Sequence, residues 1–234
     1  MINESLTYLR TSDDWVKTVL IGGLLTFFGF LLVPVVFVAG YLVRVLRATM
    51  HGDDTPPRFA NWGDLGRDGL YAVAIAFVYG IVPGLLIALT AGIAAVVAGP
   101  GPRSGLLVGG VTFVGGLLAL VVGLLAAYVV PAAVANYAEQ GSFGAGFAVS
   151  DLRPVLTSGT YATAWLLGFV VVLGAGVVTG LLSVVPFVGT FVGAFVSFYA
   201  VVAAYYIVGH AWGDARGLTV HDEDGETSTE QPAV

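Results

Sequence analysis

Four long stretches of this chain carry no charged side chain, and they constrain the fold more than any other feature. They cover residues 18–43, 69–102, 104–138 and 154–213. A helix needs about 20 consecutive apolar residues to cross a bilayer. The first three stretches therefore each hold one span, and the fourth is long enough for two. We expect an all-α, polytopic membrane protein with about five transmembrane helices and short interfacial helices.

Turn-forming residues inside and between these stretches set the bounds of the five predicted spans. The spans run over residues 18–42, 69–98, 105–130, 159–182 and 187–209. Residues 18–213 then form a single transmembrane domain, which follows an N-terminal interfacial segment over residues 1–17. The last segment, residues 214–234, is an acidic tail that we expect to be disordered, because it has little apolar surface to bury.

Two prolines bear on these bounds. Pro34 lies inside the first predicted span, where a membrane helix tolerates proline, usually with a kink, if other groups satisfy the freed carbonyl. The alternative is a re-entrant hairpin about Pro34, with each arm too short to cross. The third span is expected to close on Pro131.

The composition excludes several classes of protein. Only 10% of the 234 residues are charged, against roughly 25% in an ordinary soluble domain. The absence of cysteine removes disulfides and thiolate chemistry, and the three histidines lack metal-ligand spacing. No Asp, Glu, Lys or Arg lies inside a predicted span, which argues against a proton-coupled transporter. We expect no catalytic residue, no cofactor, no metal and no nucleic-acid partner.

Residues 40–69 form the most elaborate polar segment of the chain. Arginines near a membrane surface can each gain about 1 kcal/mol from anionic lipid, and tryptophan favours the head-group layer. The segment therefore predicts lipid head-group or partner-protein contacts at Arg44, Arg47, Arg58 and Trp62. The alternative is that the arginines fix the topology and offset the aspartates of the same segment.

The distribution of basic residues predicts an orientation. With five spans, the side that holds residues 43–68 carries six arginines, and the opposite side carries Arg10, Lys17 and Arg103. Cytoplasmic loops are enriched in Lys and Arg. We therefore expect a cell-membrane protein with its N-terminus outside and its C-terminus in the cytoplasm.

Weak internal similarity suggests a repeated unit. Asp64-Leu65 leads into Gly69 much as Asp151-Leu152 leads into Gly159. This pattern predicts a span–loop–span unit that is used twice, with the fifth span added. Glycine pairs with GxxxG spacing allow helices to approach closely, and we expect them to pack inside the protein. These pairs are Gly80/Gly84, Gly105/Gly109, Gly176/Gly180 and Gly189/Gly193.

Three kinds of function remain open. The first is a non-enzymatic membrane module that binds lipid or an unidentified membrane protein through residues 40–69. The second is a permease or channel-like component, for which the apparent repeat and the prolines of the spans are the motive. The third is an enzyme that acts on lipid at the interface, motivated only by a cluster of charged residues. That cluster is Arg44, Arg47, Asp53, Asp54 and Asp64.

Several motifs together resemble a known family. They are SDDWVKT at residues 12–18, IGGLL at 21–25, GYLVRVLR at 40–47, Pro57, Phe59, Trp62, Asp68-Gly69, the segment 137–147 and PFVG at 186–189. With these motifs the chain, up to about residue 209, resembles an uncharacterised archaeal integral-membrane family that is common in haloarchaea, a domain of unknown function. The resemblance implies a haloarchaeal origin, which agrees with a net charge of −6 and a single lysine. It implies no activity.

Overall fold

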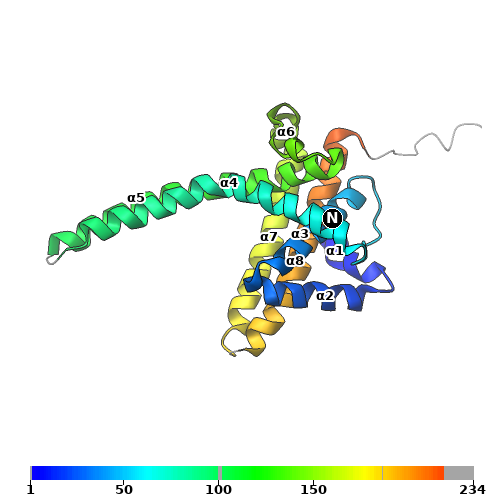
Figure 1. The fold of residues 1–234 in the computed structure, drawn as a ribbon, viewed down its shortest axis with the longest axis horizontal. Helices are drawn as coiled ribbons and strands as arrows, with labels where there is room; N and C mark the ends of the chain where they lie inside the picture. The colour runs from blue at the N-terminus through cyan, green and yellow to red at the C-terminus, as the bar shows by residue number, and fades with distance from the viewer. Residues whose placement is uncertain (1, 100–101, 186, 219–234) are drawn as a thin grey trace, which may run out of the picture.

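The structure, a computed structural model, describes residues 2–99, 102–185 and 187–218. Within these residues every regular element is a helix, and Figure 1 shows long helices that run together in pairs. Four helices are long and apolar enough to cross a membrane, or five if one bent pair near the N-terminus is counted as a single span. The predicted class, an all-α protein with several membrane-spanning helices, is therefore confirmed.

The first predicted span, residues 18–42, is not one helix. The structure has α2 (Trp15–Phe27), a short 3-10 helix η2 (Phe28–Leu31) and then α3 (Val33–Thr49). The break is at Leu32, which adopts φ 63°, a left-handed conformation that reverses the chain. α2 has 13 residues and α3 has 17, and both fall short of the roughly 20 that a span needs. Of the two predicted forms of this region, the hairpin near Pro34 therefore agrees with the structure, and the single span does not.

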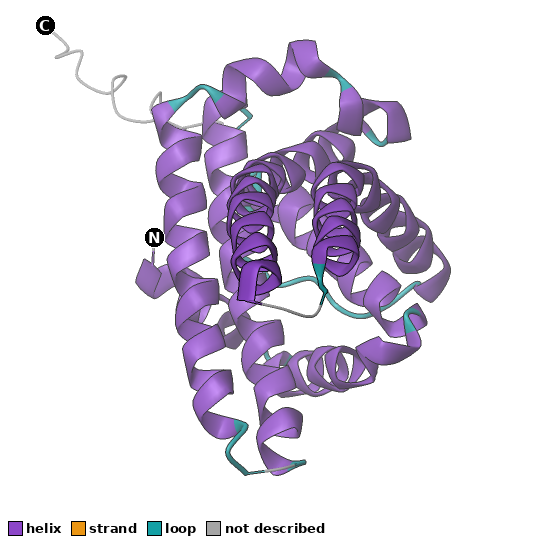
Figure 2. Ribbon diagram, turned by 90° about the vertical axis from the view of Figure 1, so that its left-hand side faces the viewer, coloured by secondary structure: helices purple, strands orange, loops and turns teal. Residues whose placement is uncertain are grey.

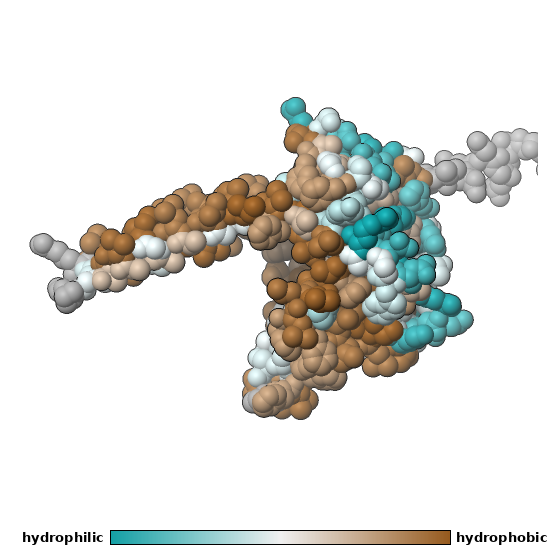
Figure 3. Space-filling model, in the orientation of Figure 1, coloured by the Kyte–Doolittle hydropathy of each residue, from teal (hydrophilic) through white to brown (hydrophobic). Residues whose placement is uncertain are grey.

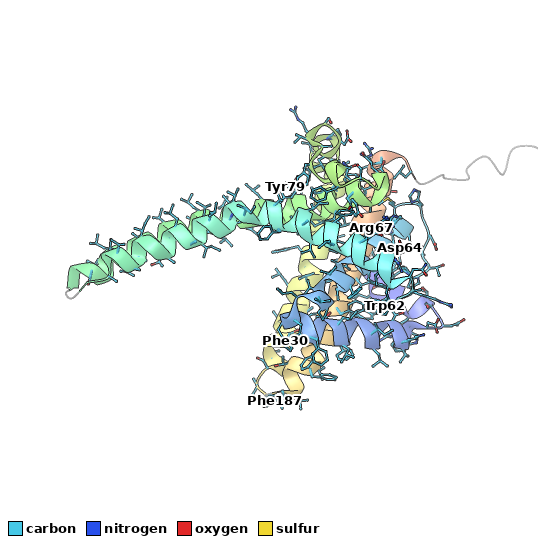
Figure 4. All side chains as sticks on the ribbon, viewed as in Figure 1. Phe30, Trp62, Asp64, Arg67, Tyr79 and Phe187 are labelled. Atoms are coloured by element: carbon cyan, nitrogen blue, oxygen red, sulfur yellow. The ribbon has the colours of Figure 1, made fainter. Side chains whose placement is uncertain are left out.

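The tip of the α2–α3 hairpin is apolar. Phe30 and Leu32 are 74% and 75% exposed, and Figure 4 shows Phe30 toward the same end of the molecule as Phe187. Phe27 packs edge-on against Phe191, near the start of α8, at 5.2 Å. An exposed apolar tip is stable in hydrocarbon and not in water. The exposed tip therefore suits hydrocarbon, as expected for a hairpin that does not cross the bilayer.

α4 (Trp62–Val97) and α5 (Pro102–Gln140) form a second hairpin, which projects from the rest of the molecule as a long arm (Figure 1). Both helices continue past the bounds that hydropathy predicted. α4 begins before residue 69, and α5 continues beyond residue 130. Their extra turns carry polar and charged residues, which the hydropathy criterion rejects but a helix end in water accepts.

The prediction that a helix closes on Pro131 is wrong, because α5 runs through this residue. Proline has no N–H, so it leaves the carbonyl of Ala127, one turn earlier, without its helical partner. The indole Nε1 of Trp165 donates a hydrogen bond to that carbonyl oxygen at 2.9 Å. The Tyr161 hydroxyl donates to the neighbouring carbonyl of Tyr128 at 2.8 Å. Side chains from α7 therefore satisfy the backbone that the proline frees.

The third hairpin consists of α7 (Gly159–Leu182) and α8 (Val188–Arg216). η3 (Phe143–Phe147) and α6 (Val149–Leu156) connect it to α5. α8 is the helix around which the others pack, since 56% of its most apolar stretch is buried. Figure 2 views the α4–α5 arm along its length, with α7 and α8 beside it.

Two glycines join α3 to α4. A Cβ on Gly40 would lie 2.0 Å from the carbonyl oxygen of Leu65, and a Cβ on Gly69 would lie 1.7 Å from that of Val36. No other residue type fits either position without moving a backbone. The first and last residues of segment 40–69 thus meet at one crossing, which closes this segment on itself.

The predicted internal packing of GxxxG glycines holds for only one of the four pairs. Gly189 and Gly193 approach Leu182 and Thr179 across the α7–α8 hairpin. The other six glycines have open space at the Cβ position, with no described atom within 4 Å. They are Gly80, Gly84, Gly105, Gly109, Gly176 and Gly180. These six therefore lie on surfaces that the protein itself does not cover.

The predicted terminal segments differ in what the structure describes. Residues 1–17 include α1 (Ile2–Thr7) and the 3-10 helix η1 (Tyr8–Thr11), which lie against α8. The first residues of the predicted tail belong to the last turn of α8. The rest of that tail, residues 219–234, lies outside the described residues, so its disorder stays a prediction. The repeat also stays a prediction, although α3, loop and α4 follow the same order as α5, connector and α7.

Candidate functional site

Polar side chains gather at one end of the molecule (Figure 3). We call this end the polar cap, and we define it as the N-terminal segment, the loop over residues 50–61, the connector over residues 141–158 and the helix ends that they touch. Every candidate functional residue predicted from the sequence belongs to it.

A buried carboxylate organises the centre of the cap. Asp68, near the start of α4, is only 4% exposed. Arg47 of α3 donates from Nη1 to Asp68 Oδ2 at 3.1 Å, and the Tyr137 hydroxyl of α5 donates to Oδ1 at 2.8 Å. Arg47 also donates from Nε to the carbonyl of Ala138 at 3.1 Å. These bonds tie three helices together, and the loss of either donor would leave a buried charge short of partners.

The Arg44 guanidinium holds the loop that precedes α4. Its Nη1 donates to the carbonyl oxygens of Ala60 at 2.7 Å and Arg58 at 3.2 Å, and its Nη2 donates to that of Asn61 at 3.2 Å. Asn61 has φ 48°, a left-handed conformation that asparagine tolerates better than most residues. Arg44 therefore satisfies loop carbonyls where the backbone turns sharply into the helix.

The N-terminal segment lies against the same loop. The Tyr8 hydroxyl donates to the carbonyl of Thr55 at 3.5 Å, and Arg58 forms an ion pair with Asp14, Nε to Oδ2, at 3.0 Å. Burial raises the pKa of the Tyr8 phenol above its ordinary value, so the group stays a neutral donor. The hydrocarbon core of a bilayer is about 30 Å thick. These contacts hold residues 1–17 beside the loop, and they do not fit the prediction that the membrane separates the two.

The C-terminal end of α8 completes the cap. His210 Nε2 lies 3.2 Å from Asp54 Oδ1 in the loop. Glu139, near the end of α5, accepts a hydrogen bond from Trp212 Nε1 at 2.7 Å and pairs with Arg216, Nη2 to Oε1, at 3.0 Å. One end of the molecule therefore holds both described terminal regions together with the ends of α3, α5 and α8.

The connector over residues 141–158 is also held by side chains. Asn136, which is fully buried, donates from Nδ2 to the carbonyl of Ala145 at 2.8 Å. Gln140 Nε2 donates to Asp151 Oδ2 at 2.8 Å. This bond and one from Ser150 hold the pKa of the Asp151 carboxyl below its usual value.

The four predicted contact residues fall into two groups. Arg44 and Arg47 donate their hydrogen bonds to the protein's own carbonyls and to Asp68. These bonds favour a structural role for the two arginines over contact with lipid or a partner. Arg58 and Trp62 stay accessible at the surface, 72% exposed at the Arg58 side chain and 45% at Trp62. Figure 4 shows Trp62, Asp64 and Arg67 at the cap end of α4.

Sequence reasoning missed the buried acid–tyrosine pair and Glu139. A signal was present, because Asp68 and Glu139 each directly flank an uncharged stretch and so stand at a helix end near the membrane surface. Their partners are distant in the sequence and could not be inferred. Within residues 2–99, 102–185 and 187–218, no group of three or more His, Asp or Glu side chains is placed to hold a metal ion.

Fold and cap together define the class: a multi-pass helical membrane protein with one polar cap. The comparisons place it more closely. The model of a protein family of unknown function, DUF4013, matches residues 24–184, and the chain belongs to this family. The matched part begins in α2 and ends after α7, so it includes the centre of the cap. No curated protein and no solved structure matches the chain.

Proposed function

We propose that this protein is a non-enzymatic membrane module that binds lipid between its hairpins. The observation that carries the proposal is how little of its apolar surface the protein covers itself. In the most apolar stretches of α5 and α7 only 6% of the residues are buried, and in α4 only 11%. Surfaces of this kind need acyl chains or the apolar helices of a partner.

The hairpins diverge from the cap, and lipid can enter the space between them. The α4–α5 arm and the α7–α8 hairpin point in different directions (Figure 1), and Pro131 of α5 contributes to a cavity between them. This cavity has a volume of about 150 Å³ and is lined by apolar and aromatic side chains that include Trp165, Phe169 and Val172. Beyond it, the visible surfaces of both hairpins are apolar (Figure 3). This lining suits hydrocarbon better than a hydrated solute.

The same geometry weakens the permease alternative. A permease that uses its prolines as hinges needs the backbone at Pro131 to move. The freed carbonyl of Ala127 is instead bound by Trp165, which favours a fixed joint.

The orientation also follows as a proposal. With the N-terminal segment at the cap, eight of the nine basic residues lie on the cap side, and only Arg103 belongs to the far end of the α4–α5 arm. The positive-inside rule then favours a cytoplasmic cap. Both the N-terminal segment and the end of α8 lie on that side, which replaces the expected outside N-terminus. The acidic, lysine-poor composition supports a salt-adapted, haloarchaeal source as part of the same proposal.

Retention of lipid by the purified protein tests the proposed function. The protein is extracted in a mild detergent, washed with lipid-free detergent and weighed with its bound lipids by native mass spectrometry. We expect bound lipid to survive the wash and to be reduced by Phe169→Ala at the junction of the hairpins. Phe77→Ala is the matched control, since Phe77 is 70% exposed on the arm. It should leave the retained lipid unchanged.

Other outcomes would contradict the proposal. A protein that stays folded without retained lipid would do so. Solute flux across proteoliposomes that depends on the prolines would favour a permease, and a stoichiometric co-purifying membrane protein would favour a protein partner.

A further inference from the structure

A second apolar groove lies where the N-terminal segment and α2 pack beside the α7–α8 hairpin. It has a volume of about 430 Å³, within the range of ligand sites. Its floor is the α8 surface at Val196 and Ala200, α7 forms one wall at Val171 and Ala175, and Val19 of α2 forms part of the other wall. Apart from the Tyr199 ring, the side chains that line its length are aliphatic or phenylalanine, with one exception.

The exception is a cation at one end of the groove. Arg10, in the 3-10 helix η1, is the charged residue among those that line it. Its side chain is exposed, and its guanidinium lies 5.9 Å from the centre of the Trp15 ring. Tryptophan and arginine side by side at the start of a membrane helix mark the head-group layer. The groove therefore begins at head-group level and continues into the hydrocarbon.

The charge of Arg10 is available to a ligand. Arg47, Arg58 and Arg216 each pair with a carboxylate of the cap. No described carboxylate forms an ion pair with Arg10, although the chain holds 15 acids and 9 basic side chains. The nearby Tyr199 hydroxyl donates to the carbonyl of Leu6, so it does not compete for an anion at Arg10.

We infer that this groove binds one anionic phospholipid of the cap-side leaflet, with an acyl chain along α8 and the phosphate on Arg10. The chemistry of the two ends sets the occupant. An acyl chain that fits the shape of an aliphatic groove is stabilised there by close van der Waals contacts along its methylene groups. A guanidinium binds phosphate oxygens through paired N–H donors. A zwitterionic lipid fills the channel equally well but carries a second charge that opposes the attraction. The inference deepens the proposed function and rests on it.

A lipid competition experiment tests the inference. The protein is loaded in mixed micelles with equal amounts of phosphatidylglycerol and phosphatidylcholine, and native mass spectrometry gives the ratio of the two in the first bound position. We expect wild-type protein to prefer the anionic lipid. Arg10→Gln should reduce that preference by about fivefold, the effect of one basic residue near an anionic lipid.

Two further variants separate a site from general attraction. Arg67→Gln is the matched control, because Arg67 is also exposed at the cap but does not line the groove. It should leave the preference unchanged. Ala175→Phe fills the groove wall and should lower binding of both lipids at the first position.

Each outcome bears on one proposal or the other. If Arg67→Gln lowers the preference as much as Arg10→Gln does, or if Ala175→Phe has no effect, the inferred site is refuted. Bound lipid with no anionic preference in any variant refutes the site and leaves the proposed function standing. If no variant retains lipid, the proposed function fails as well.

Discussion

The crossing of α3 and α4 gives the sharpest prediction about the fold. Gly40 and Gly69 let the two helices touch through their backbones, and a Cβ on Gly69 would lie 1.7 Å from the carbonyl oxygen of Val36. Gly69→Ala therefore tests whether segment 40–69 closes as described. Gly84→Ala, in the same helix, is the matched control, because its Cβ position has no described atom within 4 Å.

The expected magnitude follows from the geometry. Ordinary contact begins at 3.4 Å, so the two backbones have to part locally by about 1.7 Å. Overpacking that side chains can relieve costs about 1–3 kcal/mol. Here the obstacle is a backbone carbonyl, so we expect the upper end, about 3 kcal/mol. For a chain of this length, this corresponds to a melting temperature lower by about 6–12 °C.

The assay is thermal unfolding in one detergent, followed by tryptophan fluorescence. Gly84→Ala should leave the melting temperature unchanged or slightly higher, since alanine favours a helix over glycine by about 0.5–1 kcal/mol. Gly40→Ala should behave like Gly69→Ala, and the double variant should cost less than the sum, because both changes open one crossing. Equal melting temperatures for Gly69→Ala and Gly84→Ala would refute the described crossing.

Two other contacts give predictions of known sign. Tyr137→Phe removes a hydrogen bond to the buried Asp68 carboxylate and should cost about 1.5–3 kcal/mol in the same unfolding assay. Tyr71→Phe, which removes an exposed hydroxyl with no described partner, should cost little, and equal losses would contradict the assigned role. Trp165→Phe leaves the Ala127 carbonyl without a donor and should cost about 1–3 kcal/mol. The loss should vanish when Pro131 is also replaced by alanine, and its persistence would show that the indole acts elsewhere.

The sequence was sufficient for the class of fold because hydropathy and charge act over whole helices. Each of the uncharged stretches after residue 69 contains the body of one or two long helices in the structure. The predicted helix ends were wrong on the cap side, where α4, α5 and α8 continue into polar residues beyond the predicted spans. Hydropathy marks only the part of a helix that lies in hydrocarbon. The full length of the helix also depends on the polar residues and caps at its ends, which hydropathy does not detect.

The sequence could not decide whether residues 18–42 form one span or a hairpin, because its local features allow both. Residues 18–42 are long and apolar enough for one span, and Pro34 alone allows either a kink or a turn. The turn depends on a left-handed backbone at Leu32, a residue without propensity for it. Packing of α2 along α8, where Phe198 fills the space beside Gly22, decides between the two forms.

The predicted site was partly right in location and partly wrong in role. Segment 40–69 does form the middle of the cap, but the structure uses Arg44 and Arg47 to hold it together. Whether an arginine is held by the protein or faces solvent depends on distant residues, such as Ala138, whose carbonyl binds Arg47 from 91 positions away. The sequence analysis used Arg10 only to predict the orientation, because the groove beside it is assembled from four other helices, α1, α2, α7 and α8.

Side-specific labelling of single cysteines tests the central claim, that the N-terminal segment, the loop, the connector and the end of α8 share one side. The chain has no cysteine of its own, so each label reports one position. We expect Asp13→Cys, Thr55→Cys, Ser142→Cys and Ala215→Cys to react from the same side of the membrane, and Ser104→Cys to react from the other. Labelling of Asp13→Cys together with Ser104→Cys, opposite Thr55→Cys, would contradict the hairpin and restore a fifth span.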